Sequence, residues 1–300
     1  MSRIFNLGSV NIDHVYQVPH FARPGETLAS TGYSRGAGGK GFNQSVALAR
    51  AGADVSHIGC IGEDGEWLRQ MLVADGADCE NLNASNEPTG HAIIQIVPSG
   101  ENTIVLHGGA NRSPTTDMVA AALGSAGPGD WFLCQNETSC VPEALRVAKA
   151  AGLKTAYNAA PADPAMSAPA LPYVDILIVN ETEADALGGG HSPQDSVARI
   201  RAAHPGMDVI LTLGAEGALW SGPSCQAHAA PPACKVVDTT AAGDTFTGYC
   251  LAALMQGLPP AVALELGCKA AAISVTRSGA AQSIPHRDEL DGPLAGSPSR

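Results

Sequence analysis

The feature that most constrains the fold of this chain is a repeated alternation of short apolar runs with alanine-rich segments of helical spacing. The apolar runs are partly β-branched or aromatic and bounded by glycine, asparagine or aspartate, which is typical of buried strands. We expect strands at Ile4–Leu7, Val55–Ile61, Trp131–Leu133, Lys154–Tyr157, Asp175–Val179 and Val209–Leu213. We expect helices at Phe42–Arg50, Trp67–Ala74, Pro142–Ala151, Ser196–Ala203 and Phe246–Met255. This alternation predicts an α/β fold: a doubly wound, mostly parallel sheet with helices on both faces and ligands at the carboxyl ends of its strands.

Two stretches, at about residues 13–35 and 90–107, break the alternation and read as extended chain. The second predicts a hairpin of His91–Val97 and Thr103–His107 joined by a turn that contains Pro98 and Gly100. We expect these segments to form a small β lid over the binding face. An exposed lid sheet needs a cover, which suggests a homodimer. Residues 1–290 are predicted to form a single domain, followed by a frayed Gly/Pro/Ser-rich tail at residues 291–300.

The charge balance limits the kind of partner this protein can have. The chain carries 17 Lys and Arg against 29 Asp and Glu, a net charge of −12. Nucleic acid and anionic membranes are therefore not expected as partners, because both require basic surface. No apolar stretch approaches the ~18–20 residues that would span a bilayer, so we expect a cytoplasmic protein.

The segment from Asp238 to Phe246 carries the strongest signal for chemistry. Ala241, Ala242 and Gly243 precede a helical run, so their amides are expected at a helix N-terminus, where they would form a hole for an anion. Asp244 lies in the same turn and could accept a proton from a hydroxyl bound there. The alternative is that Asp244 caps the helix and the small residues only pack.

A glycine-rich turn runs from Arg35 to Asn43. Its letters fit the dinucleotide pattern G-x-G-x-x-G through Gly36, Gly38 and Gly41, but the preceding residues do not read as a buried strand. A P-loop is excluded because Lys40 is followed by glycine. What remains is either a turn where a ligand approaches the backbone, with Lys40 and Asn43 as polar contacts, or a turn required by packing.

Three further strand ends carry polar groups. Asn11 and Asp13 alternate with apolar residues and would face a sugar together, although an ordinary polar turn fits as well. Asn180 and Glu183 could orient a hydrated Mg²⁺, or could simply form a helix cap. The glycines of residues 212–217 would let a ligand lie against the backbone, or make a plain β-turn.

Taken in order along the chain, these segments resemble the ribokinase branch of the PfkB carbohydrate kinase family. The resemblance runs from Gly8 to Pro285 and rests on Asn11-x-Asp13, Gly38-Gly39-Lys40-Gly41-x-Asn43, Asn180-Glu181-Thr182-Glu183 and Asp238-Thr239-x-Ala241-Ala242-Gly243-Asp244. It implies an ATP-dependent sugar kinase with a β lid that often joins two subunits.

The resemblance also assigns roles to individual residues. It makes Asp244 the base and Ala241, Ala242 and Gly243 the anion hole. The positions matching those that hold the sugar are Asn11, Asp13, Gly39, Lys40, Gly41, Asn43, Glu137 and Asp244. Those matching the nucleotide site are Asn180, Thr212, Leu213, Gly214, Ala215, Glu216, Gly217, Gly243, Asp244 and Cys268, where Cys268 replaces the His or Asn often found. Glu183 matches a position near Mg²⁺, and the residues aligned with K⁺ ligands are Asp238, Thr240, Ser274, Arg277, Gly279 and Ser283.

The expected reaction is the phosphorylation of the primary hydroxyl of D-ribose by ATP, giving ribose 5-phosphate, with Mg²⁺ and K⁺ as cofactors. Phe42 and Asn136 depart from the residues usual in this branch, so fructose, deoxyribose or another sugar remains an alternative substrate. A nicotinamide-dependent dehydrogenase is a distant alternative, and a non-catalytic sugar sensor is a third.

Overall fold

The computed structural model describes residues 2–291, and its main element is a nine-stranded sheet of order β13-β12-β11-β10-β9-β8-β1-β4-β5. Its strands are β1 (Arg3–Leu7), β4 (Asp54–Ile61), β5 (Leu82–Ala84), β8 (Trp131–Gln135), β9 (Lys154–Asn158), β10 (Ile176–Asn180), β11 (Asp208–Thr212), β12 (Ala218–Ser221) and β13 (Gln226–Ala229). All neighbours pair in parallel except β11–β12 and β12–β13. The parallel strands end at one edge of the sheet, where a ligand site is expected.

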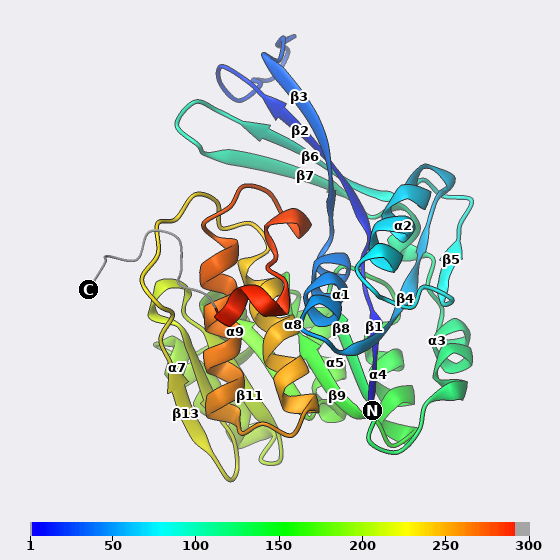
Figure 1. Cartoon of the computed structure of the whole chain (residues 1–300), viewed down its shortest axis with the longest axis vertical. Helices are drawn as coiled ribbons and strands as arrows, with labels where there is room; N and C mark the ends of the chain where they lie inside the picture. The colour runs from blue at the N-terminus through cyan, green and yellow to red at the C-terminus, as the bar shows by residue number, and fades with distance from the viewer. Residues whose placement is uncertain (1, 292–300) are drawn as a thin grey trace.

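Helices cover both faces of this sheet, because successive strand residues point to opposite sides and both sides are apolar (Figure 1). One face packs against α1 (Lys40–Arg50), α2 (Glu66–Ala74), α8 (Ala242–Met255) and α9 (Pro260–Ser274). The other face packs against α3 (Thr116–Ala122), α4 (Val141–Ala150), α5 (Pro164–Ala170), α6 (Glu181–Gly188) and α7 (Pro193–Ala203). Strand β8 illustrates the pattern: Leu133 faces the first core and Phe132 the second.

A second sheet of order β3-β2-β6-β7 projects from the main body as a lid (Figure 1). Its strands are β2 (Asn11–Gln17), β3 (Gly32–Gly38), β6 (Gly90–Ile96) and β7 (Asn102–His107). Strands β2 and β3 pair antiparallel, as do β6 and β7, while β2 and β6 pair in parallel. Strand β2 continues directly from the carboxyl end of β1, which places the lid at the ligand edge of the main sheet.

The predicted fold class, the six strands, the five helices and the lid hairpin are confirmed, with ends shifted by one to four residues. The antiparallel strands β12 and β13 were not predicted from the sequence. Most of the predicted tail, residues 292–300, lies outside the described residues, and Asp291 ends a short 3₁₀ helix. Within residues 2–291 no helix combines the length and the apolar character needed to cross a membrane. Cytoplasmic location and a single domain stay predictions.

Candidate active site

Asp244 lies in the first turn of α8, at the ligand edge of the main sheet. Its side chain is 7% exposed, and both carboxylate oxygens accept hydrogen bonds from α1. Asn43 Nδ2 donates to Oδ2 at 3.0 Å, and Gln44 Nε2 donates to Oδ1 at 2.8 Å. The residue at the N-cap is Ala241, with a left-handed backbone (φ 60°). Asp244 is therefore not the helix cap, and that alternative is wrong.

The start of α8 leaves backbone amides free. In the described part of the chain the N–H groups of Gly243 and Asp244 have no hydrogen-bond acceptor, whereas that of Ala242 donates to the Thr239 carbonyl at 3.2 Å. A Cβ placed on Gly243 would meet no atom within 4 Å. The uncovered amides and the positive end of the helix dipole suit an anion at this point.

Charged groups around Asp244 set its protonation. Burial raises the pKa of the Asp244 carboxyl, while Lys40 and the bonds from Asn43 and Gln44 lower it and leave a net rise. The pKa of Lys40 is raised although burial alone would lower it, because the carboxylates of Asp244, Glu137 and Glu183 favour its charged form. The site thus places a buried carboxyl group near an ammonium group whose charged form is favoured by the surrounding carboxylates.

A cavity of about 250 Å³ opens in front of this helix start. Its walls come from the ends of β9, β10 and β11, from α1, and from the α8 turn. The lining residues are Lys40, Asn158, Ala160, Ile178, Asn180, Glu183, Thr212, Thr239, Ala241, Ala242, Gly243, Asp244 and Thr247. The structure therefore gathers at one cavity the predicted base, the predicted anion hole and part of the predicted nucleotide site.

The glycine-rich turn brings the lid and α1 into close contact with the end of β1. A Cβ on Gly41 would lie 2.3 Å from the Cα of Gly8, and one on Gly38 would lie 2.2 Å from Asp13 Oδ2. These glycines are required by packing, which places the Asp13 carboxylate against the turn. Because the strand that leads into the turn is β3 of the lid, and not a strand of the main sheet, the dinucleotide interpretation is wrong.

Asp13 and Glu137 form the acidic part of the site. Burial, and then the charge of Glu137, raise the pKa of Asp13 to about 7. Glu137 follows β8, and its Oε2 accepts hydrogen bonds from Ser9 Oγ at 2.7 Å and from the Lys40 amide at 3.0 Å. It thereby satisfies one amide at the start of α1. Neither residue lines the 250 Å³ cavity, although Glu137 contacts the backbone of Lys40, which does line it.

Asn11 is buried at the start of β2 and is held by Asn111. Asn111 Nδ2 donates to Asn11 Oδ1 at 2.7 Å, and Asn111 Oδ1 accepts from the Val10 amide at 2.9 Å. The oxygen of the Asn43 amide has no partner in the described part of the chain, although it is buried. A buried acceptor without a donor is costly, so this oxygen is a candidate contact for a ligand hydroxyl. Asn111 and Gln44 were not identified from the sequence, because each stands next to other polar residues and no local pattern distinguishes it.

Asn180 and Glu183 form a capping box at the start of α6, as one of the two interpretations predicted. Asn180 Oδ1 accepts from the Glu183 amide at 2.9 Å, and Glu183 Oε2 accepts from the Asn180 amide at 2.9 Å. Glu183 nevertheless lines the cavity, and burial raises its pKa. A carboxylate on a cavity wall suits a hydrated Mg²⁺, and the hydrogen bonds of the capping box hold the Glu183 carboxylate in place.

Of the other residues assigned to the nucleotide, Thr212 lines the cavity, whereas Cys268 is buried in the core and its thiol faces the Ala229 carbonyl at 3.5 Å. The glycine segment after β11 forms a 3₁₀ turn, Gly214–Glu216, that leads into β12. Leu213 and Gly217 close it through a 2.8 Å backbone bond. The turn borders the ligand edge but does not line the cavity.

The predicted potassium loop brings two distant segments together. Asp238 Oδ2 accepts from the Gly279 amide at 2.8 Å, and Asp238 Oδ1 accepts from the Thr240 amide at 2.9 Å. The hydroxyls of Ser274 and Ser283 donate to nearby backbone carbonyls, and the Arg277 side chain pairs with Glu289. The structure thus links Asp238 to Thr240 and to Gly279, and the role of this loop in binding K⁺ stays a prediction.

The two residues that depart from the usual pattern, Phe42 and Asn136, are both buried. Phe42 is 0% exposed and belongs to the core between α1 and α8. Asn136 Nδ2 donates to the Pro161 carbonyl at 2.8 Å and to Ser167 Oγ at 3.1 Å, and its oxygen accepts from Tyr157. Neither side chain lines the cavity.

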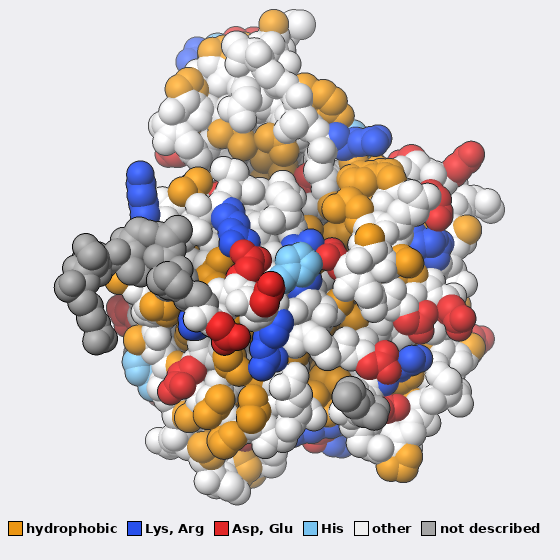
Figure 2. Space-filling view, viewed as in Figure 1, with side chains coloured by type: hydrophobic (Ala, Val, Ile, Leu, Met, Phe, Trp, Pro, Cys, Tyr) orange, Lys and Arg blue, Asp and Glu red, His pale blue; other side chains and the backbone are white. Residues whose placement is uncertain are grey.

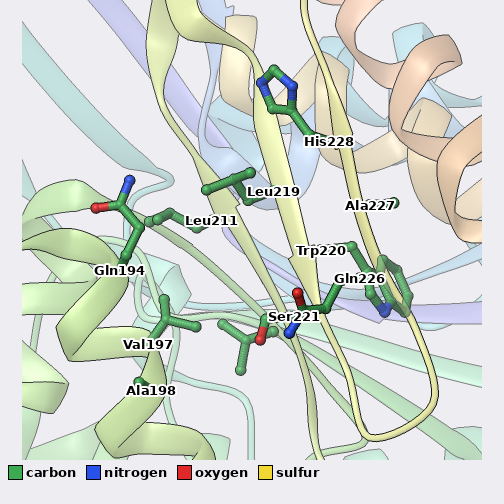
Figure 3. Close-up of a pocket in the computed structure, with 11 residues that line it drawn as sticks. Gln194, Val197, Ala198, Leu211, Leu219, Trp220, Ser221, Gln226, Ala227 and His228 are labelled. Carbon is green, nitrogen blue, oxygen red and sulfur yellow. The ribbon is translucent and has the colours of Figure 1, made fainter.

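A larger cavity of about 520 Å³ lies elsewhere, between α7 and the antiparallel edge of the sheet (Figure 3). Its walls are mainly apolar and include Val197, Leu211, Leu219 and Trp220. None of the residues predicted for catalysis or binding lines it. Size alone therefore does not identify the active site, and the smaller polar cavity is the better candidate.

Comparison with known proteins gives a consistent result. The profile of the pfkB family of carbohydrate kinases matches residues 1–287. A ribokinase of Haemophilus influenzae is 41% identical over 293 residues, 94% of this chain and 95% of that protein. The ribokinase of Cryptococcus neoformans in complex with ADP superposes with a TM-score of 0.84 at 35% identity and covers 97% of this chain and 99% of its own. Arabidopsis thaliana ribokinase complexed with ribose and ATP gives 0.86 at 28% identity, over 97% of this chain and 98% of its own. A family profile that matches nearly the whole chain, a relative of 41% identity and a shared fold lead to one conclusion: the chain belongs to the pfkB family of carbohydrate kinases.

Proposed function

We propose that this protein transfers the γ-phosphoryl group of ATP to the primary hydroxyl of D-ribose. The observation that carries the proposal is the position of Asp244, a buried carboxylate next to free amides at a helix start that faces the cavity. Similarity to ribokinases along nearly the whole chain supports ribose as the acceptor.

In the proposed mechanism Asp244 accepts the proton of the sugar hydroxyl while the oxygen of that hydroxyl attacks the γ-phosphorus of ATP. The bond between the γ-phosphorus and the oxygen that bridges it to the β-phosphate breaks, and ADP leaves. The amides of Gly243 and Asp244 stabilise the charge that spreads over the phosphoryl oxygens. Mg²⁺, held by way of Glu183, would supply further positive charge to the phosphates.

The sugar is proposed to lie between the lid and Lys40. Asn11, Asp13, Asn43 and Glu137 offer carboxylate and amide groups to its hydroxyls. K⁺ in the loop of Asp238 would act on the shape and field of the adjacent α8 turn. Closure of the lid over this site would exclude water, which could otherwise receive the phosphoryl group.

The test is a coupled assay of ADP release with D-ribose, 2-deoxy-D-ribose and D-fructose, each with K⁺ and with Na⁺. We expect the highest kcat/KM for D-ribose and a higher rate in K⁺. A preference for fructose or deoxyribose would support the alternative substrate within the same family. Equal rates in both salts would remove the potassium role while leaving the kinase assignment intact.

We also propose that the lid joins two subunits. Strand β7 is exposed at all six positions, and Figure 2 shows hydrophobic side chains exposed on the lid. The strand registers align Asp13 with Ala92 and Ala92 with Leu106, so Leu106 and Ile104 share the face that carries Asp13. A second copy seated on this face would cover apolar side chains next to the sugar site.

Sedimentation velocity tests the dimer. The natural protein should sediment as a dimer at micromolar concentration, and the double variant Ile104→Asp/Leu106→Asp as a monomer. A Glu101→Gln variant, in the turn before β7, is the control and should remain dimeric. A monomeric natural protein at high concentration would contradict the proposal.

A further inference from the structure

Gln44 is the second of two α1 residues that bind the Asp244 carboxylate, and no sequence pattern pointed to it. Its Nε2 donates to Asp244 Oδ1 at 2.8 Å, a shorter contact than the 3.0 Å bond from Asn43. Gln44 is fully buried and does not line the cavity, and its amide has partners at both ends, whereas the amide oxygen of Asn43 has no partner in the described part of the chain. It therefore contacts the base without being placed to contact the sugar.

The orientation of the Gln44 amide is fixed by partners on both of its ends. Its Nε2 also donates to Asn158 Oδ1 at 2.9 Å, while its Oε1 accepts from Gln135 Nε2 at 2.8 Å. A flipped amide would turn its oxygen toward two acceptors and its nitrogen toward a donor. Only one orientation satisfies all three contacts, and it directs an N–H group at Asp244.

Gln135 is itself held from behind, at the junction of β1 and β8. Its Nε2 donates to Asn6 Oδ1 at 2.9 Å, and Asn6 Nδ2 donates to Ser45 Oγ at 2.8 Å and to the Gly41 carbonyl at 2.9 Å. Asn6, Gln135 and Ser45 are all fully buried. This chain of amides anchors the carboxylate to the rigid centre of the main sheet and not to a loop.

We propose that Gln44 is a positioning residue that holds the Asp244 carboxylate in one orientation and in its charged form. The inference rests on the proposed role of Asp244 as the base. A carboxylate in a buried site needs donors to remain charged, and a base needs a fixed direction toward the hydroxyl it deprotonates. The hydrogen bond from Gln44 Nε2 to Asp244 Oδ1 stabilises the charge of the carboxylate and also fixes its direction.

The test compares pH profiles of kcat for the natural protein and Gln44→Met, which keeps the length of the side chain but donates no hydrogen bond. We expect kcat to fall about 10- to 100-fold, with the KM for sugar changed less than about threefold, because the base and not the sugar contact is affected. The acid limb of the profile should move to higher pH. The other charged groups that face Asp244 are Lys40, Glu137 and Glu183, and they are the same in both proteins.

Ser45→Ala is the matched control. It removes a partner of Asn6 at the far end of the same network, on the same helix, without touching Asp244. It should lower the melting temperature and leave the acid limb in place. If Gln44→Met does not fold, Gln135→Met replaces it as the test variant. We then expect a smaller shift of the acid limb to higher pH, because Gln44 loses the hydrogen bond from Gln135 that orients it.

An unmoved acid limb in Gln44→Met, or an equal shift in Ser45→Ala, overturns the inference. Asp244→Ala, assayed in parallel, separates this from failure of the proposed function. If Asp244→Ala is inactive while Gln44→Met has the pH profile of the natural protein, only the proposed role of Gln44 is rejected. If Asp244→Ala keeps its activity, the proposed roles of Asp244 and Gln44 are both rejected.

Discussion

The two sheets of this protein are built from similar strands but are stabilised in different ways. Strand β8 of the main sheet is buried at every position, between helices on both faces, whereas strand β7 of the lid is exposed at every position. The main sheet gains from apolar burial at about 25 cal/mol per Å². The lid is stabilised mainly by the backbone hydrogen bonds between its strands and by its contacts near β1. The rigid sheet therefore anchors the amide network that holds Asp244, whereas the lid carries Asp13, the residue proposed to contact the sugar.

This division predicts that chemistry and sugar binding can be separated by mutation, and the largest effect is expected at Asp244. Asp244→Ala should lower kcat by about 10²- to 10⁴-fold, because a general base is lost, while the sugar still binds. Steady-state ADP release and calorimetric titration with D-ribose measure the two quantities. Weakened sugar binding at an unchanged kcat would break the division.

A pair of truncations compares the stability of the two sheets directly. Leu133→Ala in β8, where the side chain is 0% exposed, should lower the free energy of unfolding by about 2–5 kcal/mol. Val105→Ala in β7, where it is 66% exposed, should change it by less than about 0.5 kcal/mol. Urea denaturation followed by circular dichroism gives both values. Comparable losses would mean that the lid is packed as tightly as the core.

A smaller effect than the loss of Asp244 or Leu133 is expected at the lid carboxylate, Asp13. Because the pKa of Asp13 is raised to about 7, this group takes up a proton as the pH falls from 8 to 6. A charged carboxylate accepts hydroxyl bonds better, so sugar affinity should fall over that range, by at most about tenfold per pH unit. Calorimetry at pH 6, 7 and 8 measures this effect. An Asp13→Asn variant is the control, and its weaker affinity should not vary with pH.

The raised pKa of Asp13 also predicts how the stability of the folded protein depends on pH. The folded protein holds a proton on Asp13 between the unfolded pKa of 3.8 and about 7. Stability from this group is therefore present below about pH 4 and is lost as the pH rises through 7. Asp13→Asn should raise the melting temperature of the sugar-free protein at pH 8 by a few degrees and leave it unchanged at pH 4. A fall at pH 8 would contradict the raised pKa.

Much of the main sheet could be predicted from the sequence, because a buried strand such as Val209–Leu213 produces a local apolar pattern. The short strands β12 and β13 could not, since they have mixed exposure and their partners are set by the sheet edge. The polar end of one strand and the small residues before a helix pointed to Asn180 and Asp244, and both residues line one cavity, while their roles stay predictions. The network behind Asp244 was missed because Gln44, Gln135 and Asn6 meet only in three dimensions, and each alone resembles a surface residue.

The parallel pairing of β2 with β6 has a consequence for how the protein is made. Strands β2 and β3 leave the ribosome early and can form only a two-stranded hairpin, which is marginally stable by itself. Strand β6, which pairs with β2, is synthesised only after α1, β4 and α2. The lid is thus completed by a late return of the chain, and a nascent polypeptide that stops before residue 90 would expose the edge of β2 to pairing with other chains.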